Sequence, residues 1–421
     1  MLPLQQNFAH SPQLDIAATV RRELAPLRAR LKPGAKIAVG VGSRGITHLS
    51  TIVRAVLDEL RAAGAAPFVL PAMGSHGGAT PDGQAGLLAE YGITESTMGV
   101  PIHAAMETEQ VGTTDTGAPV VASIEATRAD GILVINRVKP HTDFASETLG
   151  SGLLKMLVIG LGKRDGAAAF HLAAIQFGYE PTIRASAKTI LRTLPILGGL
   201  GIVEDQHHAT ARLAFLSAEE MESGEAGLFA EAKVLMPRLP FDHADLLIID
   251  RLGKNISGAG MDPNVTGRWV HGRSAELSPG TAAATVVRRI FVRDLTPETH
   301  GNSNGIGLAD ITTTRLINAT DKPSTYINAL TSLTPHGAKF PIHFDTDQEC
   351  ISRILDTLAG VERAKAKVIR ITDTLTVDSV EVSESYLETI SGMPNLKVSG
   401  STAEMAFDDT GNLLPIRNSV A

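Results

Sequence analysis

Residues 36–70, KIAVGVGSRGITHLSTIVRAVLDELRAAGAAPFVL, contain the pattern that decides the fold. Lys36 to Gly42 is an apolar run typical of a buried strand, and Ala66 to Leu70 is a second such run. Between them, apolar residues recur at helical spacing from Ile52 to Leu60, and Gly64 is a natural stop for a helix. A strand, a helix and a second strand in this order predict one unit of a parallel sheet.

The same alternation continues along the chain. Thr80 and Pro81 form a typical helix start. Gly131 to Asn136 (GILVIN) is a further apolar strand. Ser217 to Glu220 is a capping box before a helix that reaches about Leu235. The second half is predicted to contain strands at 244–250, 286–292 and 367–371 and helices at 322–333 and 345–358.

Two prolines, Pro237 and Pro240, lie between these halves and indicate a domain boundary. We therefore expect an α/β protein of two α/β domains, residues 1–238 and 239–421, with mostly parallel sheets. Gly253 to Arg268 is a long glycine-rich loop at the start of the second half, and loops of this length are usually functional. The active site is predicted in a cleft between the domains.

The composition limits the class of protein. Of 421 residues, 43% are hydrophobic and 20% are charged, which suits a packed core and excludes a disordered chain. The net charge of −7 argues against nucleic acid or an anionic membrane as a partner. The single cysteine, Cys350, excludes a disulfide framework and a thiolate metal cage. The N-terminus lacks a signal-peptide pattern, and the longest apolar run, Leu153 to Gly162, is too short to span a bilayer, so we expect a cytoplasmic protein.

Polar side chains follow the predicted strands of the first domain. Ser43 and Arg44 come after the first strand, where an arginine suits the capture of a carboxylate or phosphate. His76 follows the second strand between glycines, which leave its imidazole uncovered. His141 comes directly after Pro140, which fixes the backbone and favours a rigidly aimed side chain. An ion-paired surface arginine and an ordinary turn histidine are the simpler alternatives.

Two further residues lie on the segment that follows. Lys155 comes after Gly150-Ser-Gly152 in an apolar setting, where a lysine can become a nucleophile that forms covalent links. The alternative is a lysine whose stem lies along the core. His171 lies in an alanine-rich helix that begins near Lys163, where a histidine is more often a core residue than a ligand. The sequence contains no HExxH, Walker or CxxC motif, which removes several familiar enzyme classes.

The residues Arg44, His76, His141, Lys155 and His171, in this order, resemble the nickel-dependent lactate racemase family. In that family an arginine loop is followed by a glycine-flanked histidine, a Pro-His pair, a lysine in a glycine-rich segment and a helical histidine. The lysine and the last histidine are 16 residues apart in the family, and so are residues 155 and 171 here. The resemblance implies that the first domain is a racemase-like catalytic and cofactor-attachment domain, and that the second closes the cleft.

The resemblance implies a racemase or epimerase that inverts C2 of a 2-hydroxy acid by proton-coupled hydride transfer to a nickel-pincer nucleotide. This cofactor, pyridinium-3-thioamide-5-thiocarboxylic acid mononucleotide, would be attached covalently to Lys155 and would contact Ser43 and Gly152. His171 would complete the nickel site, because nickel(II) with sulfur, carbon and imidazole ligands favours square-planar coordination. A small 2-hydroxy acid and cofactor-synthesis proteins are the implied partners.

The same resemblance assigns the residues that handle the substrate. His76 and His141 would act as acid and base, because the substrate hydroxyl lies on opposite sides in the two enantiomers. Arg44 would bind the carboxylate, and Lys254 and Arg268 are candidates for contacts from the second domain. A hydride-accepting cofactor is needed, because the C2 hydrogen is too weakly acidic for a side-chain base alone.

The sequence departs from the family at Val41, where the family has an aspartate three residues before the arginine. This departure favours a substrate larger than lactate, such as a sugar acid or a hydroxy diacid. Two other classes of function stay open. One is a zinc- or other metal-dependent hydrolase or lyase that uses the same histidines, and the other is a non-catalytic ligand-binding paralogue. Retention of both His76 and His141 argues against the paralogue, since a binding protein has no use for two opposed bases.

Overall fold

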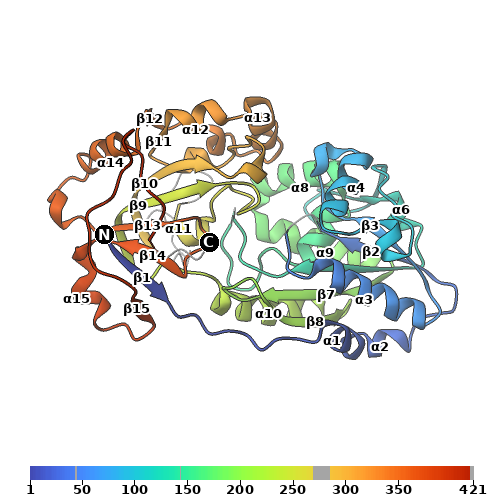
Figure 1. Ribbon diagram of the computed structural model, residues 1–421. Helices are drawn as coiled ribbons and strands as arrows, with labels where there is room; N and C mark the ends of the chain where they lie inside the picture. Colours follow the sequence, from blue (N-terminus) through green and yellow to red (C-terminus); the bar gives the residue numbers. More distant parts are fainter. Residues whose placement is uncertain (43–44, 143, 269–284, 418–421) are drawn as a thin grey trace. The chain divides into compact units, whose positions relative to one another are not determined.

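The structure is a computed structural model that describes residues 1–42, 45–142, 144–268 and 285–417 (Figure 1). The chain divides into two compact units, His10–Met236 and a second unit made of Met1–Ala9 with Pro237–Ala421. The expected first domain, residues 1–238, is therefore wrong for the first nine residues. They join the second unit because β1 (Leu2–Gln6) pairs antiparallel with β14 (Ser379–Val382) and β15 (Leu396–Val398).

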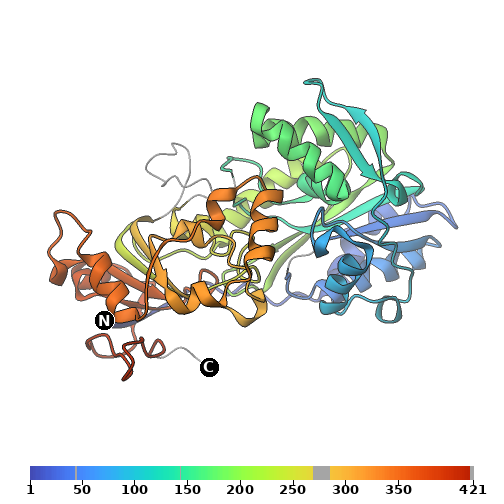
Figure 2. The same ribbon diagram turned by 90° about the horizontal axis from the view of Figure 1, so that it is seen from above.

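The unit His10–Met236 is built on a five-stranded sheet with the order β3-β2-β6-β7-β8. The first four of these strands are parallel, and β8 is antiparallel to β7. The strands are β2 (Lys36–Val41), β3 (Ala66–Pro71), β6 (Gly131–Arg137), β7 (Ile196–Glu204) and β8 (Thr210–Ser217). A separate hairpin joins β4 (Thr108–Thr113) and β5 (Pro119–Ser123), and Figure 2 shows it beside the green helices of the same unit.

Helices cover both faces of this sheet, because alternate side chains of each strand point to opposite sides. Ile37, Val39 and Val41 of β2 belong to one apolar cluster, and Ala38 belongs to the other. The helices are α1 (Ile16–Glu23), α2 (Ala25–Arg28), α3 (Leu49–Ala62), η1 (Gly77–Ala79), α4 (Pro81–Glu90), α5 (Glu95–Met98), α6 (Ile124–Thr127), α7 (Leu153–Lys155), η2 (Met156–Gly160), α8 (Lys163–Phe177), α9 (Tyr179–Thr193) and α10 (Met221–Leu235).

The second unit contains an eight-stranded sheet with the order β12-β11-β10-β9-β13-β14-β1-β15. Its strands from β12 to β13 are parallel, and β14, β1 and β15 are antiparallel additions. The strands not yet given are β9 (His243–Leu252), β10 (Val286–Leu295), β11 (Ile311–Thr313), β12 (Ile342–Phe344) and β13 (Val368–Ile371). Its helices are α11 (Pro263–Thr266), η4 (Pro297–Thr299), η5 (Ile306–Leu308), α12 (Thr314–Ala319), α13 (Lys322–Thr331), η6 (Pro335–Ala338), α14 (Asp347–Leu355), η7 (Arg363–Lys365), η8 (Glu384–Tyr386) and α15 (Leu387–Ile390).

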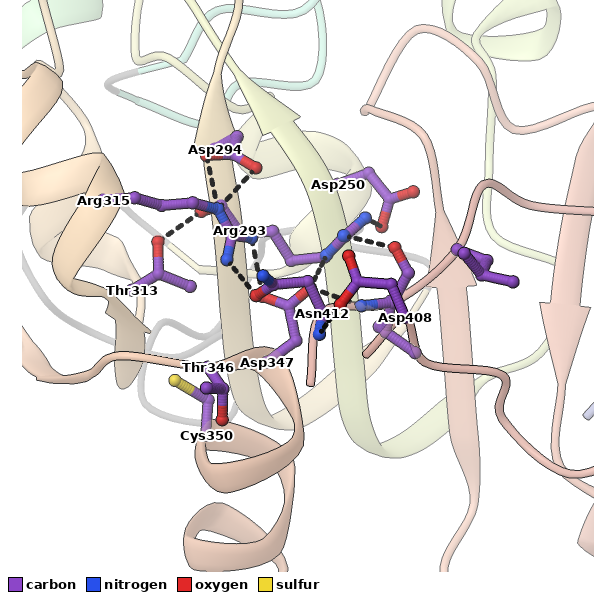
Figure 3. A network of polar contacts seen from close by, with 12 residues as sticks. Asp250, Arg293, Asp294, Thr313, Arg315, Thr346, Asp347, Cys350, Asp408 and Asn412 are labelled. Atoms are coloured by element: carbon purple, nitrogen blue, oxygen red, sulfur yellow. Dashed lines mark hydrogen bonds and ion pairs between the residues drawn. The ribbon is translucent and has the colours of Figure 1, made fainter. Parts of the chain in front are cut away.

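A buried ionic network fastens the C-terminal segment to this second sheet (Figure 3). Arg293 of β10 donates from Nε to Asp347 at 2.7 Å and pairs with Asp250 of β9 at 3.0 Å. Arg315 donates to the other oxygen of Asp347 at 2.6 Å. The Asp347 carboxylate, which is fully buried, also accepts the backbone N–H of Leu413 at 2.9 Å. Each charge thus has an opposite partner, so the network is a structural one.

The predicted fold class is confirmed: both units are α/β, and both sheets are mostly parallel. The helix predicted after Thr80 is present as α4, with the Thr80 side chain accepting the N–H of Gly83. The capping box predicted at Ser217 does not start α10, which begins at Met221 without a side-chain cap. The cleft between the domains stays a prediction.

Candidate active site

The loops that carry the predicted site residues leave one edge of the first sheet. Val41 at the end of β2 pairs with Pro71 at the end of β3 and with Ile135 of β6, which continues only to Arg137, so the carboxyl ends of these parallel strands lie at one edge. The chain passes from β2 to β3 on one side and later adds β6 on the other side of β2. Ligands of open α/β sheets bind at the carboxyl edge, where the strand order diverges in this way. The geometry therefore favours a site beyond β2 and β6.

Ser43 and Arg44 follow β2 directly but lie outside the described residues. Gly42, the residue before them, faces Asn136 of β6 and Met156 of η2. A Cβ added at Gly42 would lie 3.1 Å from Met156 Cε and 3.4 Å from Asn136 Oδ1. The loop thus begins against the segment that carries Lys155.

Gly40, Gly42 and Gly45 are spaced as G-x-G-x-x-G, a pattern of many dinucleotide-binding turns. In such turns the pattern follows the strand directly and opens the next helix. Here Gly40 lies inside β2, where an added Cβ would be 3.1 Å from Val134 Cγ1, and α3 begins only at Leu49. The first two glycines therefore permit close packing and do not form that turn.

His76 lies in the loop between β3 and α4. Gly74 and Gly77 have φ values of 60° and 64°, a backbone region that favours glycine. A Cβ at Gly74 would lie 3.2 Å from Ile159 Cγ2 and 3.7 Å from Ala167 Cβ. These neighbours belong to η2 and α8, so the His76 loop packs on the helical segment that carries Lys155 and His171.

A buried amine and amide brace the His76 loop. Lys163, which is fully buried, donates to the carbonyl of Pro71 at 2.7 Å and to Gln84 Oε1 at 3.0 Å. The Gln84 amide donates in turn to the carbonyls of Gly74 at 2.9 Å and His76 at 3.3 Å. Burial lowers the pKa of Lys163 to about 8, although the carboxylates of Glu125 and Glu107 oppose this shift.

The Pro-His segment runs beside the segment that carries the lysine. Lys139 and Ser151 exchange two backbone hydrogen bonds, each 2.8 Å long. Gly150 is required beside this pair, because a Cβ there would collide with the carbonyl of Lys139. The Lys155 amine donates to Ser151 Oγ at 3.3 Å. Hence the Lys155 amine contacts Ser151, whose backbone pairs with the segment that leads into His141.

An aromatic group links two of the predicted histidines. His141, which is 7% exposed, stacks on Phe144 with ring centroids 4.7 Å apart. The ring of Tyr179 lies 6.4 Å from His141 and 6.2 Å from His171. Phe170 contacts Tyr179 at 5.8 Å between centroids. The sequence predictions omit Phe144 and Tyr179. Because only 4% of the residues are aromatic, aromatic residues that lie near both histidines in the sequence could have pointed to them.

Gly152 lies at the start of the helical segment and is held from two sides. The Asn136 amide donates to its carbonyl at 2.9 Å. On the other side, a Cβ at Gly152 would lie 2.6 Å from the carboxyl carbon of Glu225. No side chain fits at this position without moving Glu225, a residue 73 positions away (225 − 152) that local sequence patterns do not point to.

Lys254 and Arg268 belong to the second unit, where each has partners of its own. The Lys254 amine donates to the carbonyl of Gly258 at 2.5 Å within the same loop. Arg268 forms a two-pronged ion pair with Asp310, at 3.0 and 3.3 Å. Their role toward a substrate stays a prediction.

The described residues contain no group of three or more His, Cys, Asp or Glu side chains that could hold a metal ion. The resemblance stated above requires only one imidazole from the protein, since the other nickel ligands belong to the cofactor. In the same described residues, none of the helices combines the length and apolar character needed to cross a membrane.

Comparison with known proteins identifies this N-terminal unit. Residues 6–180 match the model of the lactate racemase N-terminal domain. The chain carries a lactate racemase N-terminal domain. The matched range spans positions 44, 76, 141, 155 and 171, and the family resemblance seen in the sequence is confirmed, while the roles of the residues at these positions stay predictions. No curated protein matches the chain.

Two solved structures share the fold of this lactate racemase-like chain. A crystal structure of a protein from Thermotoga maritima matches with a TM-score of 0.55 and 14% identity, over 88% of this chain and 99% of its own. The structure of the lactate racemase apoprotein from Thermoanaerobacterium thermosaccharolyticum matches with a TM-score of 0.51 and 14% identity, over 89% of this chain and 94% of its own. At this identity the likeness concerns the fold.

Proposed function

We propose that the protein is a racemase or epimerase that inverts C2 of a 2-hydroxy acid by proton-coupled hydride transfer, with a nickel-pincer nucleotide on Lys155. The observation that carries the proposal is the pairing of Lys139 with Ser151, since Ser151 also accepts the Lys155 amine. This arrangement supports the proposal, because it brings Lys155, the proposed attachment residue, near the segment that leads into His141. The matched family supports the racemase class.

The residues present fit such a cofactor. Lys155 is partly buried, lies at the start of a helical segment and points its amine toward Ser151 Oγ. Gly150 and Gly152 permit the close approach of Lys139 and Glu225 to the segment that leads into Lys155, because a Cβ at either position would collide with them. His171 follows on helix α8 and would supply the protein's imidazole to nickel, and Ser43 would contact the nucleotide. When bound, the cofactor supplies an electrophilic acceptor for hydride, which amino-acid side chains lack.

The chain's own residues would bind the substrate and move its hydroxyl proton. We assign the carboxylate to Arg44, whose planar guanidinium suits two parallel hydrogen bonds, with Lys254 and Arg268 as further candidates. One of His76 and His141 takes the hydroxyl proton from one enantiomer, and the other returns a proton on the opposite side. Imidazole suits both steps, because it exchanges protons near neutral pH. The apolar rings around His141 limit access of water on its side.

The substrate is proposed only as a class, a small 2-hydroxy acid. Val41, which stands in place of the family's aspartate, is fully buried in the apolar cluster with Ile37 and Val39. It can therefore offer no polar contact to a substrate hydroxyl, whereas an aspartate could. Because of this departure from the family, a sugar acid or a hydroxy diacid is preferred over lactate as the test compound. Cofactor-synthesis proteins are the proposed partners, and the cytoplasm is the proposed compartment.

The test uses protein produced together with cofactor-synthesis proteins. Intact-mass and peptide mass spectrometry should find an adduct on Lys155, with stoichiometric nickel. Single enantiomers of lactate, sugar acids and hydroxy diacids are then followed by chiral chromatography. Lys188→Ala, at an exposed lysine on α9, is the control and should keep adduct and activity. Absence of both the adduct and any inversion would overturn the proposal.

A further inference from the structure

A buried carboxyl group meets the start of the helical segment that carries Lys155. Glu225 of α10 is only 1% exposed. Its Oε2 accepts the backbone N–H of Leu154 at 2.8 Å, and the N–H of Leu153 also points to this carboxyl group. The first N–H groups of a helix have no partner inside the helix, so Glu225 satisfies two of them. These donors lie one and two residues before Lys155.

The other oxygen of Glu225 covers Gly152. A Cβ at Gly152 would collide with Oε1, and this oxygen has no hydrogen-bond partner in the described part of the chain. From the opposite side, Asn136 holds the carbonyl of Gly152 at 2.9 Å. Helix α10 and strand β6 therefore fix the residue from which the helical segment starts. The direction of that segment sets where the Lys155 side chain can reach.

The charge of this carboxyl group changes near neutral pH. Burial raises the pKa of Glu225 to about 7, while the N–H groups of Leu154 and Leu153 lower it. Two charged groups act on it from a distance: Arg184 of α9 lowers the pKa, and Glu222 of α10 raises it. Arg184 and Glu222 are themselves paired at 2.5 Å. The amine of Lys155, which follows Leu154 on α7, is directed to Ser151.

We propose that Glu225 is a positioning residue for Lys155. It holds the first N–H groups of the helical segment and occupies the space over Gly152, and so aims the Lys155 amine at Ser151 Oγ. This inference rests on the proposed role of Lys155 as the attachment site, and it adds a residue that the family resemblance did not assign. An ionised carboxylate accepts the two N–H groups more strongly than a neutral acid does, so the positioning should weaken as Glu225 takes up a proton.

The experiment measures the reactivity of Lys155 in the protein without cofactor. Acetylation by a limiting amount of N-acetoxysuccinimide is followed by peptide mass spectrometry across neutral pH. The exposed Lys188 in the same molecules is the reference amine. In the native protein, the ratio of Lys155 to Lys188 labelling should change with an inflection near pH 7, where Glu225 ionises. Glu225→Gln keeps the shape and an acceptor oxygen but cannot ionise, so this inflection should disappear.

Two comparisons separate positioning from general stability. Glu222→Gln, on the same helix but at an exposed residue, should keep the inflection and only move it to lower pH, because Glu222 raises the pKa of Glu225. Glu225→Ala should change the labelling ratio about threefold or more at every pH, because two N–H groups lose their acceptor. A Glu225→Gln profile identical to the native one, or an equal loss in Glu222→Gln, would overturn the proposal.

A measurement on the native protein covers the case in which the Glu225 variants do not fold. With ¹⁵N-leucine labelling, the amide signal of Leu154 should shift with a midpoint near pH 7. A Leu154 signal that does not titrate there contradicts the proposal. Its failure is distinct from failure of the proposed function, because neither labelling nor the amide titration depends on the cofactor or on racemisation.

Discussion

The ring of Tyr179 lies 6.2 Å from the ring of His171, and the two planes meet at 68°. The same tyrosine ring is 6.4 Å from His141. The Tyr179 side chain, at the start of α9, thus lies beside both the proposed nickel ligand and a proposed acid/base histidine. Because aromatic pairs contribute about 0.5–1.5 kcal/mol beyond their buried area, this ring has enough interaction energy to orient both imidazoles.

Replacing Tyr179 with leucine should therefore leave the imidazoles of both histidines less well oriented. We expect the free energy of unfolding to fall by about 1–3 kcal/mol and the nickel content of loaded protein to fall with it. Tyr179→Phe keeps the ring and should retain more nickel than Tyr179→Leu. Elemental analysis and chemical denaturation measure the two effects. Tyr326→Leu, at an exposed tyrosine on α13, is the control, and equal nickel content in the two leucine variants would contradict the prediction.

The elements that were predicted from the sequence have strong local signals. Lys36 to Gly42 and the helix that follows combine apolar spacing with a glycine stop, and they appear as β2 and α3. Strand β7 (ILGGLGIVE) was missed because its glycines weaken a strand pattern. The structure explains them: a Cβ at Gly199 would lie 2.9 Å from Leu153, and one at Gly201 would lie 2.5 Å from Leu228. These packing constraints come from distant helices and are not visible locally.

The candidate site shows the same difference between residues with local sequence signals and residues that act from far along the chain. The motif residues on loops after β3 and β6 could be found from order and spacing, because parallel strands bring their following loops to one edge. The residues that support these loops and helices could not be found in this way. Glu225 acts on Leu154 from 71 positions away (225 − 154), and Gln84 reaches Lys163 from 79 positions away (163 − 84). Strand β1 has the most distant partner of these examples, since β14, with which it pairs, begins at Ser379.

Lys155→Ala should abolish both the covalent adduct and activity while the fold stays intact. The side chain is partly buried and donates to Ser151, so we expect a loss of stability of about 1 kcal/mol or less. Peptide mass spectrometry and circular dichroism provide the measurements. Lys163 is a poor alternative attachment site, because it is fully buried and already donates to Pro71 and Gln84. An adduct on Lys163 in the Lys155→Ala protein would show this assignment to be wrong.

His171→Ala should lower nickel retention more than His76→Ala does. The first residue is assigned as the protein's nickel ligand, whereas the second is assigned to proton transfer. Elemental analysis after dialysis against a weak chelator compares the two variants, both with the adduct still present on Lys155. Equal losses of nickel would remove the distinction between the two roles.

Glu225 should make the stability of the protein depend on pH below neutrality. Burial raises its pKa from 4.5 to about 7, so between these values the folded state binds more protons than the unfolded state. Stability should therefore fall as the pH rises from 4.5 to about 7, by about 3 kcal/mol for this group alone. Urea denaturation of the native protein and Glu225→Gln across this range isolates the effect, since glutamine does not titrate. If the free energies of unfolding of the native protein and of Glu225→Gln differ by the same amount at every pH, the prediction is wrong.

His76 and His141 should both be needed for racemisation in either direction, because each full turnover uses one as base and the other as acid. A single positioned acid or base typically contributes about 10²–10⁴ in rate, so either alanine variant should lose at least about 10² in kcat. Removal of hydrogen from one enantiomer should nonetheless survive in each variant, because that half-reaction needs only one base. Single-turnover experiments with each enantiomer, deuterated at C2, would detect loss of deuterium from the substrate without inversion. Racemisation close to the native rate in His76→Ala or His141→Ala would exclude that residue from proton transfer, and the remaining histidine would then have to serve both faces of the substrate.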